Sequence, residues 1–242
     1  MRLDKYIVDK KIVDSRNKAQ SLISNGFVLV NNKIKTQVAY NVNDSDIIRI
    51  SQHEQYVSRG AYKLIAAIDK FHIDLKNKVV LDIGSSTGGF TQVCLINGAK
   101  SIYAIDVGKN QMDQKLRQNP KIKLYEGVNF KDFNTSTYKI KKIDVIVVDV
   151  SFISLTKILK KIQEVFPYSL KLIVLIKPQF ELGKEIIKAN HGVIRSKKLW
   201  EKAIDIVTSL ARELGYKINK NYIESPIKGG DGNTEFLMYL EK

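Results

Sequence analysis

The sequence predicts an α/β fold, in which a mostly parallel β-sheet is covered by helices on both faces and follows a small N-terminal α+β module. From residue 59 onward, short apolar runs of strand length alternate with longer amphipathic segments, a pattern typical of βαβ units. Before residue 51 the elements are shorter and more polar, and a polar stretch separates the two parts. We therefore expect a first domain over residues 1–52, a linker over 53–58 and a second domain over 59–242.

The first domain is expected to begin with two helices. Arg2–Asp9 places its apolar residues on one face, and a second helix is expected to start at Ser15 and end at Asn25-Gly26. Serine is a favourable N-cap, and glycine commonly terminates a helix. Short strands are then predicted at Phe27–Val30, Lys33–Lys35 and Val42–Ile50.

The second domain is predicted to open with a helix over Arg59–Phe71. Buried strands are expected at Val79–Asp82, Ser101–Asp106, Ile122–Tyr125, Ile143–Asp149 and Leu172–Ile176. Helices are expected at Gly89–Asn97, Gln111–Gln118, Leu155–Val165 and Ser196–Leu214. The last two segments, Tyr216–Glu224 and Glu235–Leu240, are predicted to form a hairpin at the edge of the sheet.

The charge balance favours a polyanionic partner. The chain has 40 Lys and Arg against 25 Asp and Glu, a net charge of +15, which points to nucleic acid first and an anionic membrane second. Residues 1–55 hold nine basic and six acidic residues, so most of the excess lies downstream. An AT-rich genome that favours lysine codons is the alternative explanation.

Several classes of protein are excluded by composition. The single cysteine, Cys94, rules out an internal disulfide, and the three scattered histidines show no metal-ligand spacing, so no metal site is expected. The N-terminus is charged and lacks an apolar signal region. No apolar run approaches the ~20 residues needed to span a bilayer. We expect a cytoplasmic protein without stable membrane association.

The sharpest local signal is the segment Val79–Thr91, where a buried strand enters a glycine-rich turn and then a helix. Ser86 occupies the position where a dinucleotide fingerprint needs its second glycine. The Asp82-x-Gly84-x-x-x-Gly88 pattern instead suits S-adenosylmethionine (SAM), whose ammonium a carboxylate can receive. Asp106 ends the next strand and is placed to accept the two ribose hydroxyls. The sequence therefore predicts a SAM site.

The residues at the strand ends narrow the choice of the group that accepts the methyl. The loop Asp149–Ser154 has no proline, unlike enzymes that methylate exocyclic amines, and Cys94 lies within a helix rather than at a strand end. Asp149 and Lys177 do follow strands. A hydroxyl acceptor needs a general base or an orienting group, and a lysine with a neighbouring cation such as Lys63 can serve.

Five ordered motifs resemble one known family. They are Ser58–Leu64, Asp82–Thr91, Asp149–Leu155, Lys177–Glu181 and Ser225–Glu235. Together they resemble the TlyA family of rRNA 2′-O-ribose methyltransferases, which carry an FtsJ-like methyltransferase domain behind an S4 RNA-binding domain. The resemblance extends over essentially the whole chain.

The resemblance implies a function and a set of site residues. It implies SAM-dependent 2′-O-methylation of cytidine in ribosomal RNA by a Lys-Asp-Lys-Glu tetrad formed by Lys63, Asp149, Lys177 and Glu235. In this picture Lys177 activates or orients the 2′-hydroxyl, Asp149 and Glu235 hold the lysines and substrate, and Lys63 tunes the charge. It also places these residues at the cofactor: Asp82, Gly84, Ser86, Gly88, Gly89, Phe90, Asp106, Asn129 and Phe130.

The resemblance also implies that residues from Arg2 to about Ile50 form an S4 domain. RNA contacts are then expected from Arg2, Lys5, Arg16, Lys18 and Arg59. The partner would be ribosomal RNA or a ribosomal subunit, recognised by shape and charge. The sequence leaves open the target nucleotide, the subunit, the state of the substrate and the oligomeric state.

Two other functions are weighed against this one. Members of the family have been called haemolysins, which raises a membrane-active toxin, but the sequence offers no long amphipathic helix or apolar span for it. The other is a non-catalytic RNA-binding factor for ribosome assembly. All four tetrad positions are filled, which disfavours that interpretation.

Overall fold

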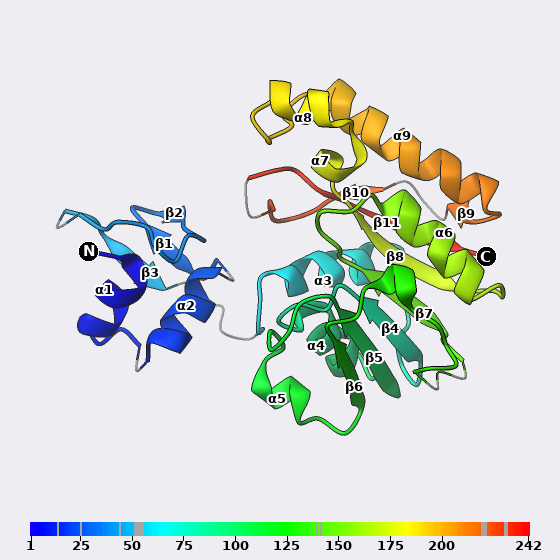
Figure 1. The fold of residues 1–242 in the computed structure, drawn as a ribbon, viewed down its shortest axis with the longest axis horizontal. Helices are drawn as coiled ribbons and strands as arrows, with labels where there is room; N and C mark the ends of the chain where they lie inside the picture. Colours follow the sequence, from blue (N-terminus) through cyan, green and yellow to red (C-terminus); the bar gives the residue numbers. More distant parts are fainter. Residues whose placement is uncertain are drawn as a thin grey trace. The chain divides into compact units, whose positions relative to one another are not determined.

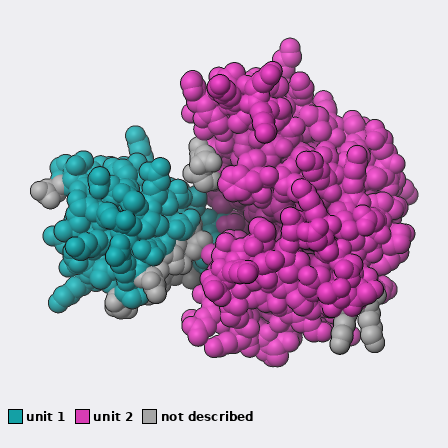
Figure 2. All heavy atoms as spheres, viewed as in Figure 1, with its two compact units in different colours: residues 1–59 teal, residues 60–242 magenta. Residues whose placement is uncertain are grey.

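The computed structural model describes residues 1–13, 15–24, 26–43, 45–50, 56–138, 140, 142–218, 222–229 and 232–242, and excludes the side chains of residues 17, 18 and 21. The chain divides into two compact units, residues 1–59 and 60–242 (Figure 2). The predicted helix stop at Asn25 and most of the predicted linker lie outside the described residues.

The N-terminal unit packs two helices on a small sheet. Helices α1 (Leu3–Asp9) and α2 (Arg16–Ser24) contribute apolar residues to a core shared with β1 (Val28–Val30). Strand β1 pairs antiparallel with β2 (Lys33–Ile34) and β3 (Ile48–Ile50), which confirms the predicted helix-helix-strand order.

The last strand of this unit is shorter than the predicted Val42–Ile50. The Asp46 carboxylate accepts the backbone N–H of Asn43 and the side-chain amide of Asn31. An aspartate that bonds the backbone in this way forms a turn, so extended pairing begins only at Ile48.

The C-terminal unit is built on one mixed sheet (Figure 1). Its strand order is β10-β11-β8-β7-β4-β5-β6, and β9 also pairs with β11. The strands are β4 (Val79–Ile83), β5 (Ser101–Asp106), β6 (Ile122–Glu126), β7 (Val145–Val148), β8 (Lys171–Ile176), β9 (Lys217–Ile218), β10 (Ile223–Glu224) and β11 (Phe236–Glu241). Strands β4 to β8 are parallel, so their carboxyl ends meet at one edge.

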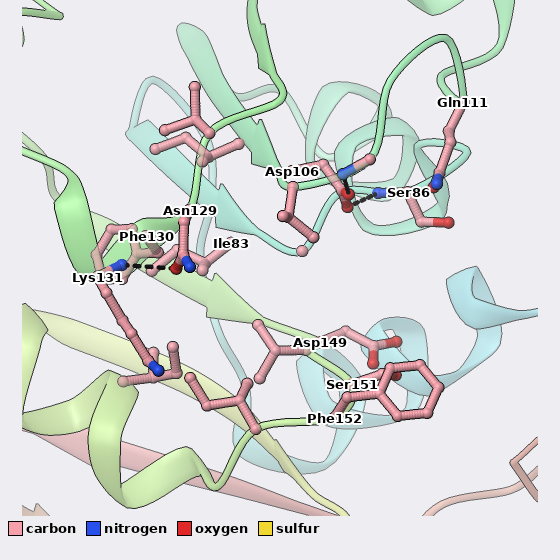
Figure 3. A pocket seen from close by; sticks show the side chains of 18 residues that line it. Ile83, Ser86, Asp106, Gln111, Asn129, Phe130, Lys131, Asp149, Ser151 and Phe152 are labelled. Carbon is pink, nitrogen blue, oxygen red and sulfur yellow. Dashed lines mark hydrogen bonds between the residues drawn. The ribbon is translucent and has the colours of Figure 1, made fainter.

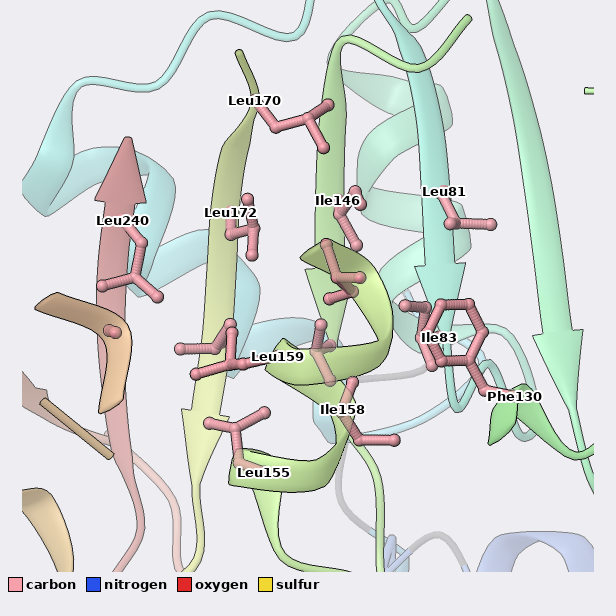
Figure 4. Close-up of a cluster of buried hydrophobic side chains, with 14 of the residues drawn as sticks. Leu81, Ile83, Phe130, Ile146, Leu155, Ile158, Leu159, Leu170, Leu172 and Leu240 are labelled. Atoms are coloured by element: carbon pink, nitrogen blue, oxygen red, sulfur yellow. The ribbon is translucent and has the colours of Figure 1, made fainter. Parts of the chain in front are cut away.

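Helices cover both faces of this sheet. Helices α6 (Leu155–Val165) and α9 (Lys197–Glu213) pack on one face, where Leu155, Ile158 and Leu159 meet the strands (Figure 4). Helices α3 (Gly60–Phe71) and α4 (Gly89–Ile96) contact each other and lie on the other face. Side chains alternate along a strand, so Leu81 and Ile83 face α6 while Asp82 faces α4.

The structure confirms the α/β class and adds elements that the sequence pattern does not reveal. The predicted hairpin at the edge of the sheet is confirmed, since β10 pairs antiparallel with β11, and β11 in turn pairs antiparallel with β8. The helix predicted at Gln111–Gln118 is present but shorter, as α5 (Gln114–Arg117), because Asp113 caps its start by accepting the Lys115 N–H. Helices α7 (Pro178–Glu181) and α8 (Lys184–Ala189) and the 3₁₀ turn η1 (Phe130–Asp132) were not predicted, because they are too brief to show helical periodicity.

Candidate active site

The glycine-rich turn after β4 is held tightly against the end of β7. Gly84 has φ of 86°, and a Cβ added there would lie 2.3 Å from the carbonyl oxygen of Asp149. Only glycine combines this conformation with so close an approach of the two backbones. The turn and the strand end that carries Asp149 are therefore fixed to one another.

A cavity of about 570 Å³ opens beside this contact, at the carboxyl ends of the parallel strands (Figure 3). Its volume is in the range of cofactor sites. Five predicted cofactor residues line it, as does Asp149: Gly84, Ser86, Asp106, Asn129 and Phe130. Other lining residues were not predicted, among them Gln111, Lys131, Ser151 and Phe152.

Asp106 fixes two loops of the cavity at the end of β5. Its carboxylate accepts the backbone N–H of Ser86 at 2.7 Å and that of Gly108 at 2.7 Å, through different oxygens (Figure 3). A carboxylate oxygen has more than one lone pair, so both oxygens keep acceptor capacity for ribose hydroxyls.

Glu126 organises the loop that follows β5, a role that sequence reasoning missed. Its carboxylate accepts the backbone N–H groups of Asn110 and Gln111, each at 3.0 Å, and the Arg117 side chain at 2.7 Å. Burial acts to raise the pKa of Glu126, but the bonds from Arg117 and the backbone outweigh it and lower the pKa to about 2. Gln111 is thereby held at the cavity.

Asp82 lies beneath the turn rather than at the cavity surface. It is fully buried, its Oδ2 accepts the Thr91 hydroxyl at 2.5 Å, and its Oδ1 has no hydrogen-bond partner among the described atoms. Burial raises the pKa of Asp82 to about 7. The described cavity lining also omits Gly88, Gly89 and Phe90, which sit in the buried start of α4.

The four residues of the expected tetrad come together from four separate elements. Lys63 Nζ, on α3, lies 2.6 Å from Glu235 Oε2 and 3.7 Å from Asp149 Oδ2. Lys177 Nζ, at the end of β8, lies 2.6 Å from Asp149 Oδ1. Asp149 therefore bridges the two lysines through its two oxygens.

Electrostatics in this cluster favour an ionised aspartate. Burial acts to raise the pKa of Asp149, but the charges of Lys177 and Lys63 outweigh it and hold the pKa below its ordinary value. Both lysine side chains are 9% exposed and Glu235 is 3% exposed. Charges this deeply buried persist because each has an opposite charge nearby.

Two residues of the motif Asp149–Leu155 were given no role by the sequence. Ser151 Oγ accepts a hydrogen bond from Lys177 Nζ at 2.9 Å. Phe152 is 93% exposed and has φ of 64°, which is unusual for a bulky residue. Its ring lies 5.3 Å from that of Phe180. The roles of both depend on loop conformation, which no sequence motif specifies.

A second charged cluster lies in the N-terminal unit, around Asp4. This carboxylate is fully buried and accepts bonds from Arg2 Nε at 3.0 Å, Arg16 Nε at 2.8 Å and Gln20 Nε2 at 3.0 Å. The hydrogen bond from Arg2 and those from Gln20 and Arg16 lower the pKa of Asp4 against the effect of burial. The arginine side chains remain 47% and 55% exposed.

The other residues that were predicted to contact RNA differ from one another in exposure. Lys5 is exposed on α1, and the side chain of Lys18 lies outside the described residues. Arg59 is half-buried, with its guanidinium packed over Gly26, where an added Cβ would lie 2.2 Å from Arg59 Nε.

The cavity suits SAM in its chemistry. An adenine can pack among apolar side chains such as Val128 and Phe130, while Asp106 offers carboxylate oxygens for a ribose. The unpartnered Oδ1 of Asp82 is an acceptor beneath the turn for which the described protein atoms supply no donor. Apolar walls with a few convergent polar groups are typical of cofactor sites.

Known proteins show both the domain content and the family. Residues 56–242 match the FtsJ-like methyltransferase family, and residues 1–48 match the S4 domain. Hemolysin A of Brachyspira hyodysenteriae is 42% identical over 240 residues, 99% of either chain. The 23S rRNA (cytidine-2′-O)-methyltransferase TlyA of Campylobacter jejuni is 39% identical over 264 residues, with full coverage of both chains. A hemolysin-named structure from Streptococcus thermophilus has a TM-score of 0.78 at 35% identity, covering 100% of this chain and 88% of that one.

The fold and the charged cluster at the sheet edge thus define an FtsJ-like methyltransferase. Within that class, the chain belongs to the TlyA family, in which an S4 domain precedes the methyltransferase domain. As for the name Hemolysin A, none of the helices in the described residues has the length and apolarity to span a membrane.

Proposed function

We propose that this chain transfers a methyl group from SAM to the 2′-hydroxyl of a cytidine ribose in ribosomal RNA. The observation that carries the proposal is the cluster of Lys63, Asp149, Lys177 and Glu235, which meets beside a cofactor-sized cavity at the carboxyl edge of the sheet. The name of the Campylobacter jejuni relative, which covers this whole chain, supports the substrate and the position of methylation.

SAM would be held by the residues of the cavity and the turn. Asp106 would accept its ribose hydroxyls, Asn129 and Phe130 would flank its adenine, and Gly84 and Ser86 would lie along its amino-acid part. Asp82, with Gly88, Gly89 and Phe90, would support the turn from below. When bound, SAM supplies a methyl group on a sulfonium, so that an O–C bond can form while the C–S bond breaks and sulfur keeps the electron pair.

The protein's own contribution is to position the hydroxyl and take up its proton. Lys177 would orient the hydroxyl and accept its proton at Nζ, because it is bonded to Asp149 and Ser151, two residues that line the cavity. Asp149 would hold Lys177 through one oxygen and Lys63 through the other. Glu235 would keep Lys63 in place and balance its charge. Positioning supplies much of the rate when the electrophile is already reactive.

RNA would be bound by both units. Arg2, Lys5 and Arg16 would contact phosphates through their exposed groups, and Lys18 and Arg59 stay as predicted contacts. Phe152 would stack on a base near the reacting ribose, since aromatic side chains commonly hold unstacked bases. With ribosomal RNA or a ribosomal subunit as partner, the reaction would take place in the cytoplasm without stable membrane attachment.

The test is to incubate the purified chain with methyl-tritiated SAM and ribosomal subunits from cells that lack the gene, and then to map ribose methylation. Label is expected at a cytidine 2′-O position. Label on a base, or no label with any ribosomal substrate, would contradict the proposal. Leakage of dye-loaded liposomes without methylation would support the haemolysin alternative instead.

A further inference from the structure

The two lysines of the tetrad have different acceptors. Lys63 Nζ faces two carboxylates, Glu235 at 2.6 Å and Asp149 at 3.7 Å. Lys177 Nζ faces one carboxylate, Asp149 at 2.6 Å, and one neutral oxygen, Ser151 Oγ at 2.9 Å. Lys177 is therefore bonded to one carboxylate and one hydroxyl, whereas Lys63 is paired with two carboxylates.

The two acceptors of Lys177 also define the direction in which the lone pair of a neutral amine would point. An ammonium has three N–H donors, and a neutral amine has two donors and one lone pair at the remaining tetrahedral position. When Lys177 is neutral, Asp149 and Ser151 take its two N–H groups and so fix where the lone pair points. Both acceptors line the cavity (Figure 3), so the amine lies within hydrogen-bond distance of two residues of the cavity wall.

The loop that carries Ser151 is anchored on both sides of this residue. On one side, the backbone N–H of Asp149 donates to the carbonyl of Ile83 at 3.0 Å. On the other side, Glu181 accepts the Leu155 N–H at 2.8 Å and the Ser154 hydroxyl at 2.6 Å. Glu181 belongs to α7, which begins directly after Lys177, so the serine loop and the lysine are tied to the same element.

We propose that Ser151 is a positioning residue that directs the lone pair of Lys177 at the ribose 2′-hydroxyl. This inference rests on the proposed function. In the step concerned, the hydroxyl proton moves to Lys177 Nζ while the hydroxyl oxygen bonds to the methyl carbon, and the C–S electron pair stays on sulfur. Without the serine hydroxyl, Lys177 keeps one fixed acceptor, and rotation about its Cε–Nζ bond scatters the lone pair.

The test compares Ser151→Ala with Ser151→Thr, which keeps a hydroxyl at an exposed position. At saturating RNA and SAM, the kcat of the alanine variant is expected to fall about tenfold or more, because the lone pair of Lys177 would no longer be held in line with the hydroxyl proton. Its KM for SAM should stay within about twofold of the wild-type value, because the carboxylate proposed to bind the ribose of SAM belongs to Asp106 and not to Ser151. The threonine variant should keep most of the wild-type kcat.

A second measurement uses the proteins without SAM. Amine-directed labelling, followed by mass spectrometry, is expected to modify Lys177 several-fold faster in Ser151→Ala than in wild type or Ser151→Thr, because one of its two hydrogen bonds is gone. Lys63, which is paired with Glu235 and Asp149, serves as the internal reference.

The outcomes separate the two proposals. If the wild-type chain forms no 2′-O-methyl group, the proposed function fails. If the wild type is active and Ser151→Ala matches Ser151→Thr in kcat, the role of Ser151 is overturned. A lower kcat with unchanged labelling of Lys177 overturns it as well, because the loss would then arise elsewhere in the loop.

Discussion

Each unit of the chain surrounds one aspartate with two cations. The cations are the more exposed members of one cluster, and the aspartate is more exposed than the cations in the other. In the N-terminal unit, Asp4 is fully buried and its two arginines are about half exposed. In the C-terminal unit the lysines are 9% exposed, and Asp149, at 19%, is the more open member.

The difference in exposure separates binding from chemistry. Exposed cations that are anchored from behind keep donors for an external anion such as a phosphate. Buried cations gain little from solvent and interact strongly with the few groups beside them. We therefore expect changes in the Asp4 cluster to alter RNA affinity and changes in the Asp149 cluster to alter the rate of reaction.

The largest effect is expected for Lys177→Ala. Removing the amine that receives the hydroxyl proton should lower kcat about 10²- to 10⁴-fold. SAM affinity should change less than about twofold, because Lys177 is not among the described residues that line the cavity. Single-turnover methyl transfer and calorimetric SAM binding check the two halves of this prediction. Near wild-type transfer by this variant would refute the assignment of the tetrad.

A third buried carboxylate, Asp82, sharpens the comparison because no described cation lies within ion-pair distance of it. Its pKa is raised to about 7, whereas cations hold those of Asp4 and Asp149 below their ordinary values. Folded Asp82 therefore keeps its proton up to about pH 7, while the unfolded chain loses it near 3.8. Unfolding then releases a proton, and the free energy of unfolding falls as pH rises between these values.

Asp82→Asn should remove this pH dependence. Relative to wild type, the free energy of unfolding of the variant is expected to rise by about 1.4 kcal/mol per pH unit between pH 5 and pH 7. The difference in melting temperature between variant and wild type should therefore shift by several degrees in favour of the variant from pH 5 to pH 7. Thermal melts without SAM check it. Parallel pH profiles for the two proteins would show that Asp82 is ionised in the fold.

The smallest effect is expected in the N-terminal cluster. Arg2→Gln/Arg16→Gln should weaken RNA binding about tenfold at moderate salt and lower the slope of log affinity against log salt by about one per cation. Asp4→Asn is the matched control, since it disturbs the same cluster but keeps both cations, and its salt slope should equal that of wild type. Equal slopes for all three proteins would mean that the arginines do not contact phosphate.

Much of the fold and part of the site could be predicted from the sequence. Strand length and alternation indicate the parallel sheet, and parallel strands bring their ends together, so Asp149 and Lys177 could be placed at one edge. Glu235 was named only through the family motifs, and Lys63 was at first only a candidate neighbouring cation, because both reach the site through tertiary packing.

The features that could not be predicted from the sequence depend on loop geometry and burial. Ser151, Gln111 and Phe152 reach the cavity through turns whose conformation no periodic pattern encodes. Arg2 and Arg16 were predicted as phosphate contacts, but the bond from Arg16 to Asp4 was not, because it joins residues 12 apart that only the packing of α1 on α2 brings together. The alternation of β4 turns Asp82 toward α4, although its motif suggested a direct place at the cofactor.

The most direct test of the account is the initial rate of ribose 2′-O-methylation as a function of RNA concentration, for wild type, Lys177→Ala and Arg2→Gln/Arg16→Gln. The arginine variant is predicted to reach the wild-type rate at saturating RNA, with only its KM for RNA raised. The lysine variant is predicted to stay inactive at every RNA concentration. Recovery of the lysine variant at high RNA, or a lowered kcat with unchanged KM in the arginine variant, would contradict the division between a binding cluster and a reacting cluster.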